Sequence, residues 1–387
     1  MVELIHICYI IWKFKSPKNF IGMGGAENQL LKIIEHLKNN SKIKITIITK
    51  QTPNDLVYEK IAVNKEIIRL NVANIPLISM IIFTISAFFM LLKINKRNGI
   101  NIIHVPLPDF FIIILNFFSK IMRIPVINRI AADELYPKNK GNFWFINRII
   151  VRKLMLKLDG IQVLNPIAKN YAKYLKYPDE RIFLIPNGTK IPNKYNIYND
   201  FTYNLLYIGA MRYHPEKEKT EQKNLLFLID AFYELAKRDN RLKLIMVGDG
   251  NYRTTLESKV KEYNIEKKIE FTGYQRNIQK YHLKSDIFIN PSWKEGMPNT
   301  VVEAMASGMV VFCSDIPEHR FLIKSNLIGI LFDPNDKENL VKKIINLYEN
   351  KNDFQKISEN ARSYIKENLS IEKTVKAIID MYSFYLH

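Results

Sequence analysis

Cysteine is scarce in this chain, and its scarcity excludes two kinds of architecture. Of the 387 residues only Cys8 and Cys313 are cysteines, and each lies in an apolar run. Two isolated thiols provide neither a disulfide framework nor a cysteine-rich zinc site. We therefore expect two buried thiols on separate β-strands, in a protein of a reducing compartment.

Two further signals are missing, those of a repeat and of a secretory leader. The chain has no low-complexity tract and no internal repeat, which argues against fibrous and solenoid proteins. Glu3, rather than a basic segment, precedes the apolar residues at the N-terminus. We therefore expect a first β-strand there in place of a signal peptide, and a cytoplasmic protein.

Acidic residues are few in the first half of the chain. Residues 1–195 contain 29 Lys and Arg against 12 Asp and Glu, a balance of +17, whereas residues 196–387 contain 28 against 26, a balance of +2. Charge confined to one half indicates that this half faces a phospholipid surface, a nucleic acid or a diphosphate-bearing substrate. No zinc-binding, helix-turn-helix or aromatic-basic pattern accompanies the charge, which argues against a nucleic acid.

One long segment has no charge at all. Residues 71–92 form a run of 22 uncharged positions, and three basic residues follow within the next five. The run is long enough to span a membrane. Polar residues dilute it, however, and it leads directly into residues 101–107, which are expected to contain a buried strand. A spanning helix would pull that strand from its sheet, so we expect a packed or interfacial helix with a basic edge.

A second apolar segment repeats this pattern in the same half. Residues 110–118 are strongly apolar and lie close to Lys120 and Arg123. Attachment of the first half to the surface of an anionic membrane explains both its charge and its hydrophobicity. We therefore expect a peripheral protein on the inner face of the cytoplasmic membrane.

Apolar runs of strand length alternate with segments of helical period along the whole chain. Strands are expected at 4–11, 43–48, 67–70, 102–105, 126–130, 160–163, 182–185, 204–208, 242–247, 269–271, 287–290, 310–313 and 329–332. Helices are expected at 26–37, 148–158, 225–238, 253–263, 299–306, 337–348 and 354–368. Alternation of this kind is typical of parallel sheets that helices cover on both faces.

The length of the chain exceeds what one ordinary core supports, so we expect two domains. The Asn-, Pro- and Tyr-rich stretch around position 195 is typical of a connection between them. The expected organisation is a first domain at 1–190, a linker at 191–203, a second domain at 204–370 and a C-terminal helix at 371–387 that packs back on the first domain. The predicted fold is α/β, with two Rossmann-like domains whose parallel sheets face each other across a cleft.

The segment 285–322 carries the sharpest chemical signal. Glu295 and Glu303 lie eight positions apart, and between them a strand gives way to a Pro- and Gly-containing loop and then to a helix. A helix N-terminus that follows such a loop is a ready anion site, because backbone N–H groups and the helix dipole point toward the loop. Carboxylates on either side of that site suit a sugar nucleotide. The alternative is structural, because Thr300 and Glu303 have the spacing of a capping box.

The same motifs recur in a known family. In the back half these are NLLYIGAM, QKNLLFLIDAF, KLIMVGDG, IEFTGY, SDIFINPS, EGMPNTVVEAMASG, SDIPEH and GILFDPND. In the front half they are GGAENQLLKIIEHL, NIIHV and IPNGTKI. Over nearly its full length the chain thereby resembles glycosyltransferase family 4, the group 1 glycosyltransferases, which are retaining enzymes of the GT-B architecture.

The resemblance implies roles for the carboxylates. Glu303 would hold the ribose hydroxyls of a nucleotide, and Glu295 the donor sugar and distal phosphate. The backbone of the intervening loop and helix start would complete this donor site through Gly296, Met297, Pro298, Asn299 and Thr300.

Cations are implied as catalytic groups beside Glu295. Lys223 matches the lysine that binds phosphate in the family, where it would neutralise the leaving diphosphate. The family often has Gly-Arg after the first strand of the second domain, whereas this chain has Gly-Ala-Met-Arg, so Arg212 would reach the phosphates from two positions later. The charged insertion before Lys223 has no counterpart that assigns it a role.

The remaining implied contacts come from other loops. Gly24 and Gly25 open the first helix and would let backbone approach a donor phosphate. Tyr274 would border the base pocket. The acceptor side would involve His104, Arg129 and Asp133; the family often has a histidine near the position of Asp133, and this chain lacks it.

The resemblance implies a metal-independent hexosyl or N-acetylhexosaminyl transferase without a cofactor. No Asp-x-Asp sequence occurs, which argues against the metal-dependent single-domain transferases. The donor would be a nucleoside diphosphate sugar, UDP-linked, and the acceptor a lipid-linked or polysaccharide glycan, as in capsule, O-antigen or exopolysaccharide assembly.

Two rival functions stay open at this point. A sugar-nucleotide epimerase of the same architecture needs general acid and base residues in the cleft, which the missing histidine makes harder to provide. A non-catalytic basic protein that binds nucleic acid would use the charge of the first half and leave the two carboxylates without a role.

Overall fold

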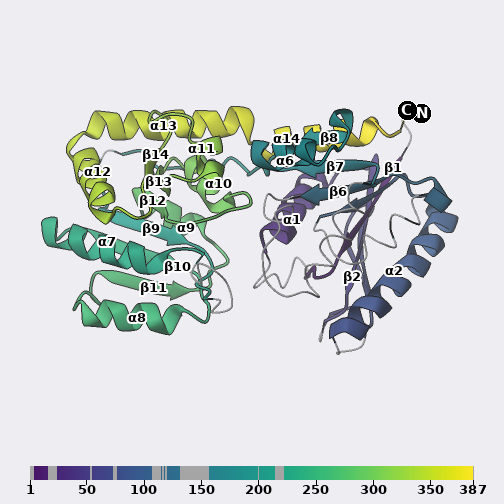
Figure 1. Ribbon diagram of the computed structural model, residues 1–387, viewed down its shortest axis with the longest axis horizontal. Coiled ribbons are helices and arrows are strands. Elements are labelled where there is room, and N and C mark those ends of the chain that lie inside the picture. The colour runs from purple at the N-terminus through teal and green to yellow at the C-terminus, as the bar shows by residue number, and fades with distance from the viewer. Residues whose placement is uncertain are drawn as a thin grey trace. The chain divides into compact units, whose positions relative to one another are not determined.

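The structure, a computed structural model, describes residues 4–15, 24–52, 55–72, 76–106, 115, 117, 120–130, 157–198, 200–213 and 222–386. The chain divides into two compact units. The first comprises Met1–Asn187 and Thr374–His387, and the second comprises Gly188–Lys373. Each unit contains one sheet with helices on both faces, which confirms the α/β fold with two parallel sheets (Figure 1).

The first unit is built on an eight-stranded sheet. Its strands are β1 (Ile5–Ile11), β2 (Ile43–Lys50), β3 (Tyr58–Ala62), β4 (Lys65–Leu70), β5 (Ile102–Val105), β6 (Val126–Ile130), β7 (Gly160–Val163) and β8 (Ile182–Leu184). They lie in the order β3-β4-β2-β1-β5-β6-β7-β8. All neighbours are parallel except β3, which pairs antiparallel with β4 at the edge. The described helices that pack on this sheet are α1 (Gly25–Leu37), α2 (Pro76–Asn98), α6 (Pro166–Tyr174) and α14 (Ile371–Ser383).

The first sheet has its topological switch point between β1 and β5. From β1 the chain passes through α1 to β2 on one side, and from β4 it passes through α2 to β5 on the other. Ligands of such sheets bind beyond the carboxyl ends of the strands that flank this point.

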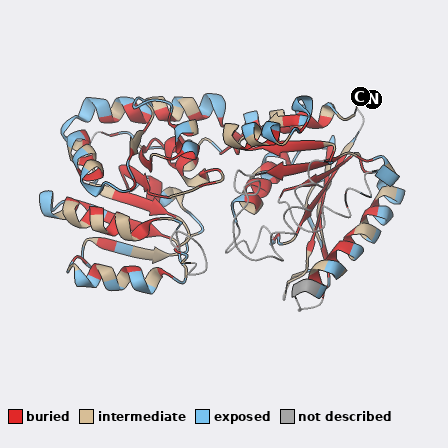
Figure 2. Ribbon diagram, in the orientation of Figure 1, coloured by how far each residue is buried: buried red, intermediate tan, exposed pale blue. Residues whose placement is uncertain are grey.

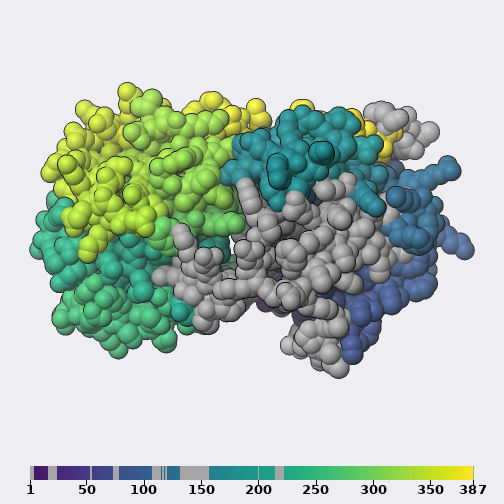
Figure 3. Space-filling model, in the orientation of Figure 1, coloured from purple at the N-terminus to yellow at the C-terminus, as the bar shows by residue number. Residues whose placement is uncertain are grey.

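Helix α2 has two different faces. Phe83, Ala87, Leu91 and Ile94 are buried in the hydrophobic core of the first unit. The opposite side is open to solvent, as the burial colours show (Figure 2), and in the space-filling view α2 forms part of the surface of this unit (Figure 3). The helix is long and apolar enough to cross a membrane by length and composition, but one face belongs to the core.

The second unit is built on a six-stranded, wholly parallel sheet. Its strands are β9 (Asn204–Ile208), β10 (Lys243–Val247), β11 (Ile269–Gly273), β12 (Ile287–Asn290), β13 (Val310–Ser314) and β14 (Ile330–Phe332), in the order β11-β10-β9-β12-β13-β14. Its helices are α7 (Leu225–Arg238), α8 (Arg253–Glu262), α9 (Gln279–His282), α10 (Asn299–Ala306), α11 (Pro317–Leu322), α12 (Lys337–Glu349) and α13 (Lys351–Asn368).

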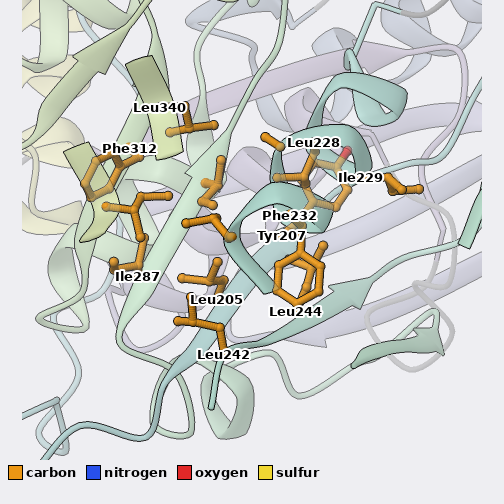
Figure 4. Packing of buried hydrophobic residues seen from close by; sticks show 14 of the residues in the cluster. Leu205, Tyr207, Leu228, Ile229, Phe232, Leu242, Leu244, Ile287, Phe312 and Leu340 are labelled. Atoms are coloured by element: carbon orange, nitrogen blue, oxygen red, sulfur yellow. The ribbon is translucent and has the colours of Figure 1, made fainter. Parts of the chain in front are cut away.

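The core of the second unit joins the central strands to α7 and α12. Leu205 and Tyr207 of β9 pack with Leu228 and Phe232 of α7, and Leu340 of α12 belongs to the same cluster (Figure 4). This packing fixes the start of α7 relative to the carboxyl end of β9.

The stretch expected to be a linker, 191–203, is instead part of the second unit. Tyr198 is 5% exposed, and its hydroxyl lies 2.9 Å from the carbonyl oxygen of Asp286 and 2.8 Å from that of Gly308. In the same stretch, Asn196 donates from Nδ2 to the carbonyls of His282 and Ser285, each at 2.8 Å. From Thr374 onward the C-terminal segment belongs to the first unit.

Both cysteines are buried and free, on β1 and β13. Burial raises the pKa of both thiols, so neither is a reactive thiolate at neutral pH.

Candidate functional site

The switch point of the second sheet lies between β9 and β12. The chain leaves β9 through α7 to β10 on one side, and it reaches β12 on the other side after α9. The carboxyl ends of these two strands and the first turns of α7 and α10 therefore meet at one edge of the sheet. This is the edge at which doubly wound sheets bind ligands.

Glu295 lies in the loop that follows β12 and is 8% exposed. Its Oε1 atom accepts hydrogen bonds from Lys223 Nζ at 2.7 Å, from Ser292 Oγ at 2.8 Å and from Asn290 Nδ2 at 3.2 Å. All three donors reach the same oxygen, and no described residue donates to Oε2. The carboxylate is thus held on one side and offers its second oxygen as an acceptor.

The protonation state of Glu295 follows from these neighbours. Burial raises the pKa of the carboxyl, but the charge of Lys223 and the hydrogen bonds from Lys223 and Ser292 outweigh burial. The pKa of Glu295 therefore lies below its ordinary value. A carboxylate that stays ionised accepts hydrogen bonds and does not act as an acid.

Hydrogen bonds of the two residues that flank Lys223 hold this lysine against Glu295. The Trp293 N–H donates to the carbonyl of Gln222 at 2.9 Å, and Gln222 Nε2 donates to the carbonyl of Lys294 at 2.9 Å. The next residue, Asn224, precedes α7 with a φ of 52° and donates from Nδ2 to the carbonyl of Pro334 at 3.2 Å. The structure therefore brings Lys223 and Glu295 together, and it commits the lysine to the carboxylate rather than leaving it as an isolated cation.

Sequence reasoning missed His319, which lies in α11 beneath this site. The ring is wholly buried, and its Nδ1 lies 2.8 Å from the carbonyl oxygen of Ser314, so the proton belongs on Nδ1. Burial lowers the pKa of His319 to about 4, although the negative charge of Glu295 opposes this shift. Ser314 Oγ donates to the carbonyl of Ser292, whose own hydroxyl bonds Glu295. The only signal in the sequence was a histidine inside the SDIPEH motif.

The structure rules out the capping-box interpretation of Glu303. Helix α10 begins at Asn299, and its N-cap residue is Pro298, whose side chain makes no capping hydrogen bond. Thr300 is the second residue of the helix rather than its N-cap, and Glu303 is half-buried one turn in. A structural role as a cap partner of Thr300 therefore does not account for this carboxylate.

The backbone between the two carboxylates offers fewer donors than expected. Pro298 has no N–H group. The Asn299 N–H donates to the carbonyl of Met297 at 2.9 Å in a tight turn. Met297 and Pro298 are buried, whereas Gly296, Asn299 and Thr300 are half-buried at the sheet edge.

The other expected donor-side residues are more dispersed. Arg212 is exposed in the loop after β9, and Tyr274 follows β11 with 42% of its surface exposed. Gly24 and Gly25 lie in the first unit at the start of α1, where Gly24 is the N-cap. A Cβ atom on Gly24 would lie 2.5 Å from Oε2 of Glu27, so an acidic side chain already occupies the space beside this helix N-terminus.

Two of the expected acceptor-side residues lie at the switch point of the first sheet. His104 Nδ1 lies 2.6 Å from the hydroxyl of Tyr382 in α14, and that hydroxyl lies 2.8 Å from the hydroxyl of Tyr9. Arg129 donates to the carbonyl of Pro106 at 3.2 Å and to Asn187 Oδ1 at 2.8 Å. Tyr9, His104 and Arg129 line a cavity of about 20 Å³.

Electrostatics make His104 a neutral residue. Burial lowers its pKa to about 3, and the charge of Arg129 acts in the same direction. A histidine with this pKa donates no proton at neutral pH. Asp133 lies outside the described residues, as do residues 148–156 of the expected helix at 148–158. Within the described residues, no three His, Cys, Asp or Glu side chains form a group that could hold a metal ion.

Comparison with known proteins extends these observations. Residues 23–191 match the family described as "Glycosyltransferase Family 4", and residues 217–364 match "Glycosyl transferases group 1". The chain is 28% identical over 166 residues to the UDP-Gal:α-D-GlcNAc-diphosphoundecaprenol α-1,3-galactosyltransferase of Escherichia coli, a match that covers 42% of this chain and 42% of the relative. The chain thus spans less than half the length of that relative.

Two other similarities cover nearly the whole chain. An uncharacterised glycosyltransferase of Methanocaldococcus jannaschii is 26% identical over 385 residues, which is 96% of this chain and 98% of the relative. The solved structure of Anabaena HepE in complex with UDP and glucose has a TM-score of 0.76 at 16% identity, and covers 98% of this chain and 100% of the other. At that identity the structural likeness shows the fold alone.

Proposed function

Because the chain belongs to the group 1 glycosyltransferases of the GT-B fold, we propose that it transfers a sugar from a UDP-linked donor to a lipid-linked or polysaccharide acceptor in surface-glycan assembly. The observation that carries the proposal is the pair Glu295–Lys223 beside the first turn of α10, at the switch point of the second sheet. An ionised acceptor with one open oxygen suits sugar hydroxyls, and a helix N-terminus suits a phosphate.

The donor would bind with its sugar on Glu295 and its ribose on Glu303. Oε2 of Glu295 is available to a hydroxyl, and Glu303 lies half-buried in α10, one turn from the helix start. The name of the E. coli relative gives a UDP-sugar as its donor, and the Anabaena structure contains UDP and glucose. Both support a uridine nucleotide as the donor for this chain.

The proposed reaction retains the configuration of the transferred sugar. The bond from the anomeric carbon to the diphosphate oxygen breaks, and a bond from that carbon to the acceptor oxygen forms on the same face. The proton of the acceptor hydroxyl passes to the departing diphosphate, so no protein base is required. His104 fits such a mechanism, because a histidine with a pKa of about 3, in contact with the Tyr382 hydroxyl, is neutral at pH 7 and does not act as a general acid.

We further propose that the reaction needs neither a metal nor a cofactor. In that case cations and N–H groups must stabilise the leaving diphosphate. Lys223 retains two N–H donors beyond the one directed at Glu295, and Arg212 is exposed in the neighbouring loop. A lipid-linked acceptor also suits a peripheral location on the inner face of the cytoplasmic membrane.

The test is release of UDP from a panel of UDP-sugars, incubated with the protein and a lipid-linked acceptor extract. Glu295→Ala is expected to lower kcat by about 100- to 1000-fold because it removes an interaction with the reacting sugar. Glu303→Gln is expected to raise KM for the donor instead. Glu338→Gln, on the exposed surface of α12, is the matched control and should leave both constants unchanged.

Several results would contradict the proposal. Excess EDTA should leave the rate unchanged, and a loss of activity would refute metal independence. A protein that no nucleoside diphosphate stabilises in a thermal shift, but that binds DNA or RNA in a salt-sensitive way, would be a nucleic-acid-binding protein. Conversion of one UDP-sugar into its epimer without release of UDP would identify an epimerase.

A further inference from the structure

The outward face of α2 carries a row of apolar side chains that contact solvent. Their exposed fractions are 46% for Ile78, 44% for Ile81, 47% for Ile85, 61% for Phe89 and 38% for Leu92. Spacings of three and four residues place these five side chains in one line along the helix. We call these five residues the α2 stripe. At 1.5 Å per residue it is about 21 Å long.

Exposed apolar surface is concentrated in the unit that carries the stripe. Among the described residues, 20 large apolar side chains are exposed, and 15 of these belong to the first unit. Of the ten outside the stripe, seven are scattered over loops, edge strands and chain ends, whereas the stripe places five on a single helix face. A continuous apolar face of this kind marks an interaction surface.

The charges on α2 and its flanks indicate which kind of partner this surface suits. No acidic residue occurs between Glu66 and Asp109, so α2 and its flanks contribute no negative charge. Lys93, Lys96 and Arg97 are all exposed at the C-terminal end of the helix. Lys96 lies 18 residues after Ile78. Eighteen residues make five turns of about 3.6 residues, so Lys96 continues the line of the stripe.

We propose that the α2 stripe and these three cations seat the first unit on an anionic phospholipid bilayer, with the helix parallel to the membrane plane. Apolar side chains would enter the boundary between headgroups and acyl chains, and the cations would lie among the lipid phosphates. The inference rests on the proposed function, to which it adds the residues that contact the membrane and their orientation.

The packing of α2 excludes a spanning arrangement. Phe83, Leu91 and Ile94 on the opposite face belong to the core, so insertion of the helix across a bilayer would remove them from it. A second copy of the chain fits the surface less well than lipid does. Two stripes packed together would bring six cations and no acidic residue from α2 into one interface, which charge complementarity disfavours.

Flotation of the full-length protein with vesicles tests the proposal. We expect binding to vesicles of phosphatidylglycerol and phosphatidylcholine in equal amounts, weaker binding at high salt, and no binding to phosphatidylcholine alone. The triple variant Ile81→Ser, Ile85→Ser, Phe89→Ser should lower the affinity for the mixed vesicles by about tenfold or more. The triple variant Lys93→Gln, Lys96→Gln, Arg97→Gln should lower it by about fivefold per cation removed, and should weaken its dependence on salt.

Matched controls come from the second unit. Ile197→Ser with Leu327→Ser removes exposed apolar side chains, and Lys261→Gln with Lys267→Gln and Lys342→Gln removes exposed cations. Both control variants should bind vesicles as the wild type does. The inference is overturned if the wild type does not bind the anionic vesicles, or if the serine triple variant binds them as tightly as its control.

Two further measurements distinguish the remaining outcomes from one another. Sedimentation that shows a dimer dissociated by the serine triple variant, with no vesicle binding, would assign the stripe to a second copy and refute the lipid proposal. Thermal stabilisation by UDP is measured on every variant. Stabilisation by UDP without vesicle binding refutes the membrane inference alone, and vesicle binding without any response to a nucleoside diphosphate or its sugars refutes the proposed function alone.

Discussion

Lys223 Nζ lies 2.7 Å from Oε1 of Glu295, and this ion pair joins the start of α7 to the loop after β12. The two residues are 72 positions apart in the sequence. The pair is largely enclosed, since the side chains of Lys223 and Glu295 are 26% and 10% exposed. A charge left without its partner in such a place is costly, so the pair makes a prediction about stability as well as about binding.

Removing one partner should cost more than removing both. We expect Lys223→Met to lower the free energy of unfolding by about 1–3 kcal/mol, a value reduced from that of a fully buried pair because the lysine is partly exposed. The double variant Lys223→Met, Glu295→Gln should recover part of that loss. Urea denaturation of the two single variants and the double variant measures this coupling. Additive losses would show that the pair contributes nothing to folding.

The start of α10 separates a structural role for Glu303 from a role in binding. Because Thr300 is not an N-cap, Thr300→Ala should change the free energy of unfolding by less than about 0.5 kcal/mol. Glu303→Gln should weaken UDP-sugar binding by about 10- to 100-fold, the worth of a hydrogen bond to a charged group, and leave stability nearly unchanged. Titration calorimetry and urea denaturation check the two expectations. A stability loss shared by both variants would restore the capping interpretation.

Much of the second unit was predictable from the sequence, because its strands are short apolar runs and its helices are amphipathic. The strand at 204–208 and the helices at 225–238 and 299–306 have the predicted bounds. Strand β3 escaped prediction because an exposed edge strand has no apolar face to bury. Short helices such as α9 and α11 escaped prediction because one or two turns are too short to show a helical repeat of apolar residues.

The sequence pattern named the residues of the candidate site but not the contacts between them. The spacing of Glu295 and Glu303 indicated a loop and a helix start, and this arrangement is present. The partnership of Glu295 with Lys223 depends on which strands neighbour each other, and local sequence pattern does not contain that information. His319 escaped for the same reason, since only the fold brings α11 beneath the loop after β12.

The buried His319 should make stability depend on pH in a defined window. The folded protein holds its pKa at about 4, whereas the unfolded chain has the ordinary value of 6.5. As the pH falls below 6.5 the unfolded state takes up a proton that the folded state does not accept until about pH 4, so stability falls across this window. His104, whose pKa is about 3, acts in the same direction.

The variant His319→Gln removes one of these two titrating histidines. We expect the decrease in unfolding free energy between pH 7 and pH 4.5 to be smaller in this variant than in the wild type, whatever its stability at pH 7. Urea denaturation at a series of pH values measures the slope. Thr254→Ala, at an exposed position in α8, removes no titrating group and is the control that should keep the wild-type slope. Equal slopes in all three proteins would contradict a neutral, buried His319.

The last prediction concerns the hydroxyl of Tyr382, which contacts two buried polar groups of the first unit. It lies 2.8 Å from the hydroxyl of Tyr9 and 2.6 Å from His104 Nδ1, and all three side chains are at most 3% exposed. Tyr382→Phe deletes one oxygen and leaves both groups without this partner. Since an unsatisfied buried polar group costs about 1–3 kcal/mol, we expect a loss of that order in unfolding free energy, with no cavity formed. Tyr174→Phe, at a residue that is 77% exposed, is the control and should be neutral. If Tyr382→Phe is as stable as that control, the hydroxyl network does not hold α14 on the first sheet.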